Sequence, residues 1–237
     1  MDAGAEGLTM VNATILSFLS DNASELLSMT WWTLKLFVAA FAIAVAIAVP
    51  LGVWLGHIHR GGFLAINVGN VGRALPSLAV IAIGVGIFGI GFTNVMVALV
   101  ILAVPVILTN AYVAVNGVDR ELTEAARGMG MTGWETLFRV ELPLALPLLF
   151  AGMRTAALYV MATTPLAAVT GAPGGLGDVI ANQASYGFEG VVTASLLIAA
   201  LAFAADGLFA LLQRYVTPRA LRGRGGIEAK GSVLEAT

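Results

Sequence analysis

Cysteine is absent from this sequence of 237 residues, and charged residues are scarce. Without cysteine the chain can form no disulfide framework and carry out no thiol chemistry. Charged residues make up 11% of the chain, well below the share of roughly 25% that soluble domains carry. This composition excludes an ordinary soluble domain. The formal net charge of −2 also provides no electrostatic basis for nucleic-acid binding.

Lysine and histidine are rare as well. The only lysines are Lys35 and Lys230, and neither lies in the Gly-rich run of a phosphate-binding loop. Any ATP hydrolysis must therefore belong to another chain. The two histidines, His57 and His59, lie together in a polar turn, and we expect a solvated turn there rather than a metal site. We expect no metal, no cofactor and no enzyme, because no acid–base or nucleophilic set can be placed at one depth.

Long apolar runs take the place of these polar groups, with 59% hydrophobic residues and a mean hydropathy of +0.92. A helix needs about 20 apolar residues to cross the hydrocarbon core of a bilayer. Five runs reach that length, over residues 36–55, 63–90, 93–115, 144–169 and 191–212. The second is interrupted by Arg73, Pro76 and a series of glycines. None alternates with period two, so we predict an all-α membrane protein with five transmembrane helices.

Basic residues predict the orientation of these spans. Segments 57–62, 116–143 and 213–237 hold Arg60, Arg120, Arg127, Arg139, Arg214, Arg219, Arg222, Arg224 and Lys230. The intervening loops 86–92 and 171–190 hold none, and only Lys35 lies on that side. Because cytoplasmic loops are enriched in Lys and Arg, the N-terminus is expected outside and the C-terminus in the cytoplasm.

The chain accordingly divides into three parts. Residues 1–32 form an extracytoplasmic segment, in which 8–32 are expected to form a short amphipathic helix at the membrane surface. Asn22 and Glu25 fit a capping box, and Trp31 and Trp32 are placed as an interfacial anchor. Residues 33–217 form the transmembrane domain, with a loop over 116–143 between the third and fourth helices. Residues 218–237 form a cytoplasmic tail.

Loop 116–143 predicts two short helices joined by a glycine elbow. Asp119 is placed to cap the first helix, which Gly128 and Gly130 interrupt. Thr132 and Glu135 fit a capping box for the second helix, which Pro143 is expected to bound. Such a protrusion suits a docking surface. The small side chains of Ala125 and Ala126 allow close approach, and Glu124 offers a carboxylate to a partner.

This loop resembles that of the permease subunits of bacterial ABC importers, the inner-membrane components of binding-protein-dependent transport. Their motif has Glu-Ala-Ala, three residues, Gly, nine residues, a β-branched aliphatic residue, any residue and Leu-Pro. The matching positions, with every spacing kept, are Glu124, Ala125, Ala126, Gly130, Val140, Leu142 and Pro143. Val140 stands where isoleucine is usual.

The resemblance implies that the loop is a coupling helix in a groove of a separate ATP-binding subunit. It also implies a location in the bacterial plasma (inner) membrane and a second permease, either the same chain or a sister. A structural or signalling membrane protein and a channel or secondary carrier are the alternatives of another class.

A second resemblance, over about residues 20–217, is to permeases for osmoprotectants such as glycine betaine, choline and carnitine. It rests on segments 26–34, 49–52, 73–79, 152–156 and 174–178. Methionine-type and nitrate- or sulfonate-type permeases share the five-helix core and remain alternatives. By this resemblance, residues 171–190 would face a solute-binding protein. An ordinary Gly/Pro turn with a short helix beginning at Asp178 explains them equally well.

The outer half of the fourth span carries aromatic and polar side chains. Tyr159, Met161, Thr163 and Thr164 could line a path for a quaternary ammonium ion through cation–π contacts. Ordinary packing between helices is the favoured alternative, since small and polar residues are common there. Pro165 is expected to bend this helix.

Three charged residues are predicted at a similar depth in the membrane. Arg73 and Arg154 each lie about ten residues into a span, roughly 15 Å deep at 1.5 Å per residue, and Asp206 lies at a comparable depth. An unpaired charge at that depth is costly, so Asp206 is expected to pair with Arg154 or Arg73. The pair could lock the spans together, or it could change partners between conformations.

Overall fold

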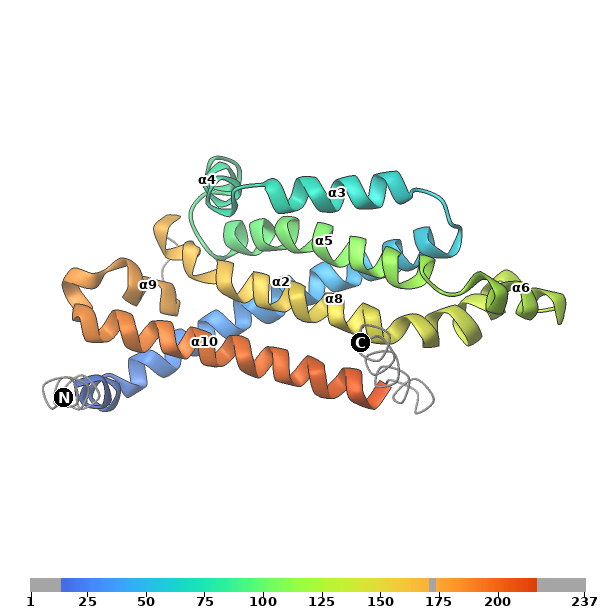
Figure 1. Ribbon diagram of the computed structural model, residues 1–237. Helices are drawn as coiled ribbons and strands as arrows, with labels where there is room; N and C mark the ends of the chain where they lie inside the picture. The colour runs from blue at the N-terminus through green and yellow to red at the C-terminus, as the bar shows by residue number, and fades with distance from the viewer. Residues whose placement is uncertain (1–13, 171–173, 217–237) are drawn as a thin grey trace, which may run out of the picture.

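A computed structural model describes residues 14–170 and 174–216, and every regular element within those ranges is a helix (Figure 1). A helical stretch over residues 14–21 is followed by α2 (Ala23–His57), α3 (Gly62–Ala74), α4 (Ser77–Phe88), α5 (Phe92–Asn116), α6 (Arg120–Gly128), α7 (Gly133–Thr136), the π-helix η1 (Leu137–Glu141), α8 (Leu142–Thr163), the 3-10 helix η2 (Thr164–Thr170), α9 (Leu176–Ala181) and α10 (Gln183–Val216). The predicted tail over 218–237 and the first 13 residues of the predicted segment 1–32 lie outside the described residues.

The long helices α2, α5, α8 and α10 run along the length of the molecule, with α6 at one end and α9 at the other (Figure 1). Helix α5 is central, since it packs against α2, α3, α4 and α8. Small residues allow α2 and α5 to approach closely. A Cβ atom at Gly52 would lie only 2.6 Å from Cβ of Ala111. Close contact through small residues is the usual way in which helices associate in membranes.

Four helical stretches are long and apolar enough to cross a membrane, over residues 23–57, 92–116, 133–169 and 183–216. The run predicted as the second span is instead two helices, α3 and α4, bent by 89°. The bend falls at Leu75 and Pro76, because the residue before a proline is driven into the extended conformation. The span count is therefore four, or five if the bent pair is one span.

Helix α2 begins well before the predicted first span. It runs without a break from Ala23 to His57, across the boundary predicted at residue 32. The capping box predicted at its start is wrong. The amide of Asn22 donates to the carbonyl of Phe18 at 3.0 Å, and Glu25 accepts from the hydroxyl of Tyr186 at 2.7 Å. The side chain of Glu25 therefore links α2 to α10 rather than capping the start of α2.

Pro143 does not bound a separate helix, as the sequence had suggested. Helical structure continues from Gly133 through η1 into α8. In η1 the N–H of Leu142 donates to the carbonyl of Leu137, a bond from residue i to i−5. Pro143 is the second residue of α8 and directly follows this irregular turn, where it can donate no backbone hydrogen bond to the preceding turn. At the other end, α8 gives way to the 3-10 helix η2 at Thr164, one residue before Pro165.

Helix α10 is the least covered of the long helices. In its most apolar stretch only 6% of the residues are buried, against 56% for α5. Phe203 and Tyr215 are among its most exposed side chains. Its apolar surface therefore faces lipid or another chain rather than the core.

Candidate functional site

Loop 116–143 forms a compact protrusion at one end of the molecule. The carboxylate of Asp119 accepts the backbone N–H of Glu121 at 2.9 Å, which confirms the predicted cap of α6. Gly130, with φ of +89°, makes the turn between α6 and α7 in the left-handed region that favours glycine. The predicted elbow is present.

The predicted capping box of α7 is confirmed. Glu135 accepts hydrogen bonds at 2.9 Å from both the backbone N–H and the hydroxyl of Thr132. These bonds, the backbone one first, hold the pKa of the Glu135 carboxyl below its ordinary value, and Arg139 adds a smaller effect. The carboxylate is therefore ionised at neutral pH and caps the start of α7.

The Glu-Ala-Ala triplet lies on α6 with its members facing different ways. Glu124 is exposed and pairs with Arg120 at 3.2 Å. Ala125 is exposed, whereas Ala126 is only 2% exposed and packs inside the protrusion. The expectation that both alanines face a partner is therefore wrong for Ala126. At the far end of the motif, Val140, Leu142 and Pro143 are half-buried in η1 and the start of α8.

Sequence reasoning missed an apolar surface on this protrusion. Four large side chains are exposed by 47–75%, namely Leu122, Met129, Trp134 and Phe138. The rings of Trp134 and Phe138 stack with centroids 5.9 Å apart. We call these four residues the loop surface. Exposed apolar groups rimmed by charge are typical of protein–protein contacts. The i, i+4 spacing of Trp134 and Phe138 was the available signal.

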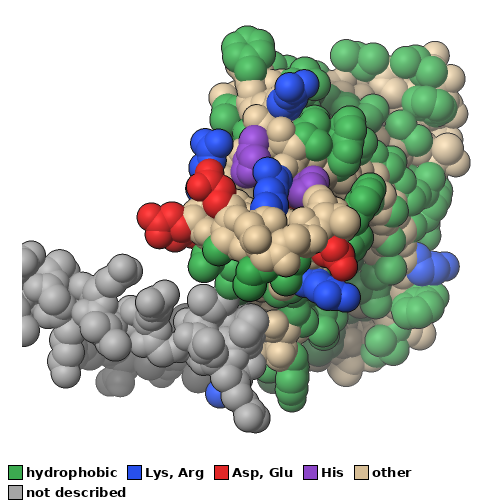
Figure 2. Space-filling model, turned by 90° about the vertical axis from the view of Figure 1, so that its right-hand side faces the viewer, with side chains coloured by type: hydrophobic (Ala, Val, Ile, Leu, Met, Phe, Trp, Pro, Cys, Tyr) green, Lys and Arg blue, Asp and Glu red, His purple; other side chains and the backbone are tan. Residues whose placement is uncertain are grey.

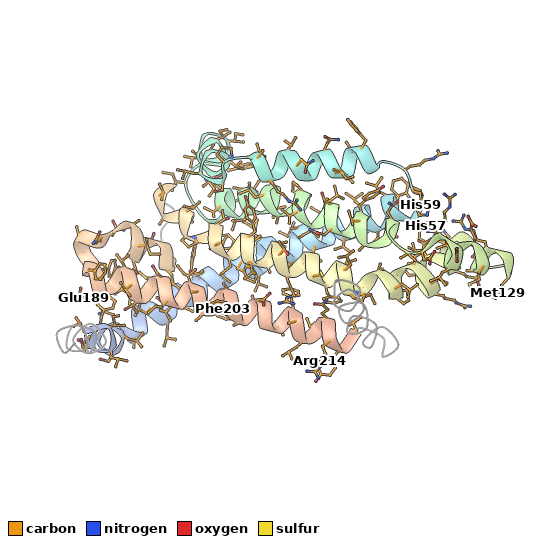
Figure 3. The ribbon with its side chains drawn as sticks, viewed as in Figure 1. His57, His59, Met129, Glu189, Phe203 and Arg214 are labelled. Carbon is orange, nitrogen blue, oxygen red and sulfur yellow. The ribbon has the colours of Figure 1, made fainter. Side chains whose placement is uncertain are left out.

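Figure 2 views the molecule from this end and shows charged and histidine side chains gathered around it, with apolar side chains beyond them. Both histidines lie beside the loop (Figure 3). The prediction of a solvated turn is wrong for His57. Its Nδ1 atom lies 2.6 Å from Oε2 of Glu141, and its side chain is only 15% exposed. His59 contacts Asn116 at 3.0 Å. The described residues include no group of three metal-ligating side chains.

Of the three predicted intramembrane charges, two are brought together. Arg154 on α8 donates through Nε and Nη2 to the two oxygens of Asp206 on α10, each at 2.8 Å. The predicted pairing is confirmed for Arg154. Arg73 lies at the end of α3, on the other side of α5, where it is exposed. It has no ion pair within the described part of the chain.

The residues proposed to line a solute path are mostly inside the chain. Met161, Thr163 and Thr164 are buried. The two threonine hydroxyls donate to carbonyls four residues earlier on their own helix, at 2.8 Å each. Tyr159 is half-buried. The arrangement of the three buried residues suits helix packing, the alternative that the sequence had favoured.

At the opposite end, residues 174–186 are tied to α2. The buried hydroxyl of Thr33 accepts the N–H of Leu176 at 3.1 Å, and the hydroxyl of Tyr186 donates to Glu25. A short helix is present as predicted, although α9 begins at Leu176 rather than at Asp178. Asp178 instead accepts the N–H of Gly174. Residues 171–173 lie outside the described ranges.

Comparison with known families identifies the family of the chain. Residues 48–222, most of the chain, match the model of the binding-protein-dependent transport system inner membrane component. The chain belongs to this family. It is thus a permease of the ABC-transporter type, as the motif had suggested. Family membership favours this assignment over a structural membrane protein or a secondary carrier.

Curated relatives of this permease support the same family. The glycine betaine/carnitine/choline transport system permease protein OpuCB of Bacillus subtilis (strain 168) is 37% identical over 88% of this chain and 96% of its own. The carnitine transport permease protein OpuCB of Listeria monocytogenes is 35% identical, over 88% and 95%. The osmoprotectant import permease protein OsmW of Salmonella typhimurium is also 35% identical, over 87% and 99%.

Solved structures show that the permease fold is shared. A chain of the MetNI methionine ABC transporter in an inward-facing conformation matches with a TM-score of 0.73 at 24% identity, over 84% of this chain and 99% of that one. A chain of an amino acid ABC transporter crystallised with histidines matches with a TM-score of 0.70 at 22% identity, over 85% and 98%. At these identities the likeness concerns the fold.

Proposed function

We propose that this chain is the membrane-spanning permease subunit of an ATP-driven importer for a quaternary ammonium osmoprotectant. The observation that carries the proposal is the loop surface on a motif-bearing protrusion, built by caps and a glycine elbow as a rigid docking element. The names of the relatives, which include glycine betaine, carnitine and choline, support the solute class.

The importer would contain further subunits. An ATP-binding subunit would receive the protrusion, since the sequence has no phosphate-binding loop of its own. A second permease, either the same chain or a sister, would bring a second protrusion to a second ATP-binding subunit. A solute-binding protein would dock at the end formed by residues 174–186, which would face outward. In the proposed arrangement the N-terminus would lie outside and the C-terminus in the cytoplasm of a bacterium.

Arg73 supports the choice of a solute with a carboxylate. Asp206 is the only acidic residue in the predicted spans and is already bound by Arg154. A lone guanidinium facing lipid near the middle of the membrane, where the sequence places Arg73, would cost at least about 2.5–3.5 kcal/mol. We propose that Arg73 faces the solute path instead. An arginine there can bind the carboxylate of glycine betaine or carnitine through two hydrogen bonds.

The test is purification of the complex followed by reconstitution. We expect an ATPase subunit to co-purify, and uptake of radiolabelled glycine betaine, carnitine or choline to require ATP. Methionine is the matched comparison, because the similar MetNI chain belongs to a methionine transporter. Uptake of methionine alone would contradict the solute class. Absence of any ATPase partner would contradict the function itself.

A further inference from the structure

Glu141 is a fully buried carboxyl group that no motif accounts for. Its side chain is 0% exposed, and its Oε2 atom lies 2.6 Å from Nδ1 of His57. Its Oε1 atom is also buried and has no hydrogen-bond partner within the described residues. Burying such a group is unfavourable unless it is paired. His57 is therefore the contact on which the position of Glu141 depends.

The pair connects a long helix to the protrusion. His57 is the last residue of α2, and Glu141 is the last residue of η1, which continues directly from α7. His57 lies close to the start of α7 too, since a Cβ atom at Gly133 would lie 3.5 Å from its Nε2 atom. The imidazole thus lies near both ends of the segment over 133–141. Figure 3 shows His57 beside the loop that has Met129 at its tip.

Glu141 lies in a π-helical turn. A π-helix inserts one extra residue into a helical run, and such turns are frequent at functional positions. Here the bond from Leu142 N–H to the carbonyl of Leu137 marks the insertion. Glu141 is the last residue of this turn. Glu141 therefore makes its short contact with α2 from an irregular turn.

Helix α2 is tied by polar contacts at its other end as well. There the hydroxyl of Thr33 accepts the N–H of Leu176, and Glu25 accepts from the hydroxyl of Tyr186. Between these contacts and His57 the helical assignment is continuous, although Pro50 lies inside the helix and removes one backbone hydrogen bond. Its 35 residues give a rod roughly 50 Å long at 1.5 Å per residue. One continuous helix therefore contacts the protrusion at one end and residues 174–186 at the other.

We infer that His57 and Glu141 are positioning residues through which movement of the protrusion is passed to α2, and along α2 to residues 174–186. This inference rests on the proposed function, which supplies an ATPase at the protrusion and a binding protein at the far end. The short polar contact fixes α2 to the loop in direction as well as distance. Apolar packing between the same elements would allow them to slide.

A single substitution is a poor test because it leaves the other group buried without a partner, which is strongly destabilising. The double variant His57→Leu/Glu141→Leu removes both polar groups together, and paired apolar replacement is often nearly neutral for folding. The readout is the number of glycine betaine molecules taken up per ATP hydrolysed in proteoliposomes of the full complex. A merely structural role would not change this ratio.

We expect the double variant to insert, to keep its ATPase activity and to lose at least about fivefold in the transport ratio, the lower range of typical coupling between sites. The control is Asn116→Ala, which removes the neighbouring contact of His59 to the last residue of α5 but leaves the contact between His57 and Glu141 in place. An unchanged ratio in the double variant would overturn the inference. The wild-type complex reports separately on the proposed function. If the ATPase activity of the wild-type complex did not respond to a loaded binding protein, both the proposed function and this inference would be contradicted.

A second measurement does not require that the protein fold with leucine at positions 57 and 141. Because the chain has no cysteine, His57→Cys/Glu141→Cys introduces the only two thiols. We expect this variant to be uncoupled as purified, and a short bifunctional thiol reagent to restore the transport ratio by rejoining α2 to the loop. A monofunctional reagent should not restore it. Equal effects of the two reagents would contradict a mechanical connection.

Discussion

Arg154 and Asp206 form a bidentate ion pair between α8 and α10, with both nitrogen–oxygen distances at 2.8 Å. The arginine Nε and one terminal nitrogen each reach a different carboxylate oxygen, a geometry that lysine cannot reproduce. This pair joins the least covered long helix to the rest of the molecule. The side chains remain 34% and 25% exposed, so the pair lies at an edge of the bundle.

Asp206→Asn should weaken the attachment of α10. The amide keeps one acceptor oxygen but loses the charge and the second oxygen, so we expect a melting temperature several degrees lower in detergent. The exchange Arg154→Asp/Asp206→Arg should recover part of the loss. Glu189→Gln is the control, because it removes a carboxylate from the same helix that makes no ion pair in the described chain. Equal melting temperatures for Asp206→Asn and wild type would rule out a stabilising role.

Gly130→Val should uncouple the protrusion without preventing membrane insertion. The φ of +89° at Gly130 strains any β-branched residue, although no neighbouring atom lies within 4 Å of the added Cβ. The strain is about 1–2 kcal/mol and would displace α7 relative to α6. We expect binding-protein-stimulated ATP hydrolysis to fall severalfold.

Two controls isolate the backbone effect at Gly130. Gly128→Ala adds a methyl group in equally open space at a position without a left-handed φ, so it should retain activity. Gly130→Asn should be milder than Gly130→Val, because asparagine tolerates the left-handed conformation. Normal ATPase stimulation in Gly130→Val would show that the elbow is dispensable.

The topology is testable with single cysteines in a chain that has none. Met129 is 75% exposed at the tip of the protrusion, and Ser185 is exposed near the start of α10. We expect Ser185→Cys in intact cells to react with a membrane-impermeant maleimide, and Met129→Cys to react only after the membrane is opened. Reaction of both from the same side would contradict the proposed orientation.

Arg73→Gln should alter solute preference. Hydrogen bonds to a charged group contribute about 1.5–3 kcal/mol, so their loss should raise the KM for glycine betaine and carnitine roughly tenfold or more. Choline has no carboxylate, and its uptake should change little. Arg60→Gln removes a guanidinium from the turn before α3 and serves as the control. A uniform fall for all three solutes would refute recognition of a carboxylate by Arg73.

The sequence by itself determined the local features of this permease. Apolar runs located the long helices, because a segment that crosses a bilayer must be long, apolar and helical. The cap at Asp119 and the capping box of Thr132 and Glu135 were predictable, since they join residues two or three positions apart. The motif around Gly130 was readable for the same reason. It encodes a turn, and turns depend on backbone conformation within a few residues.

Only the tertiary structure decided which distant groups meet. His57 and Glu141 are 84 positions apart, and their contact depends on where α2 ends relative to the π-helical turn. The choice of Arg154 over Arg73 as the partner of Asp206 depends on α3 and α10 lying on different sides of the core. Hydropathy records how apolar a helix is but not which neighbour each face meets. Side-chain packing between helices decides that. The 89° bend of the second apolar run has a local cause at Pro76, but its size was visible only in the structure.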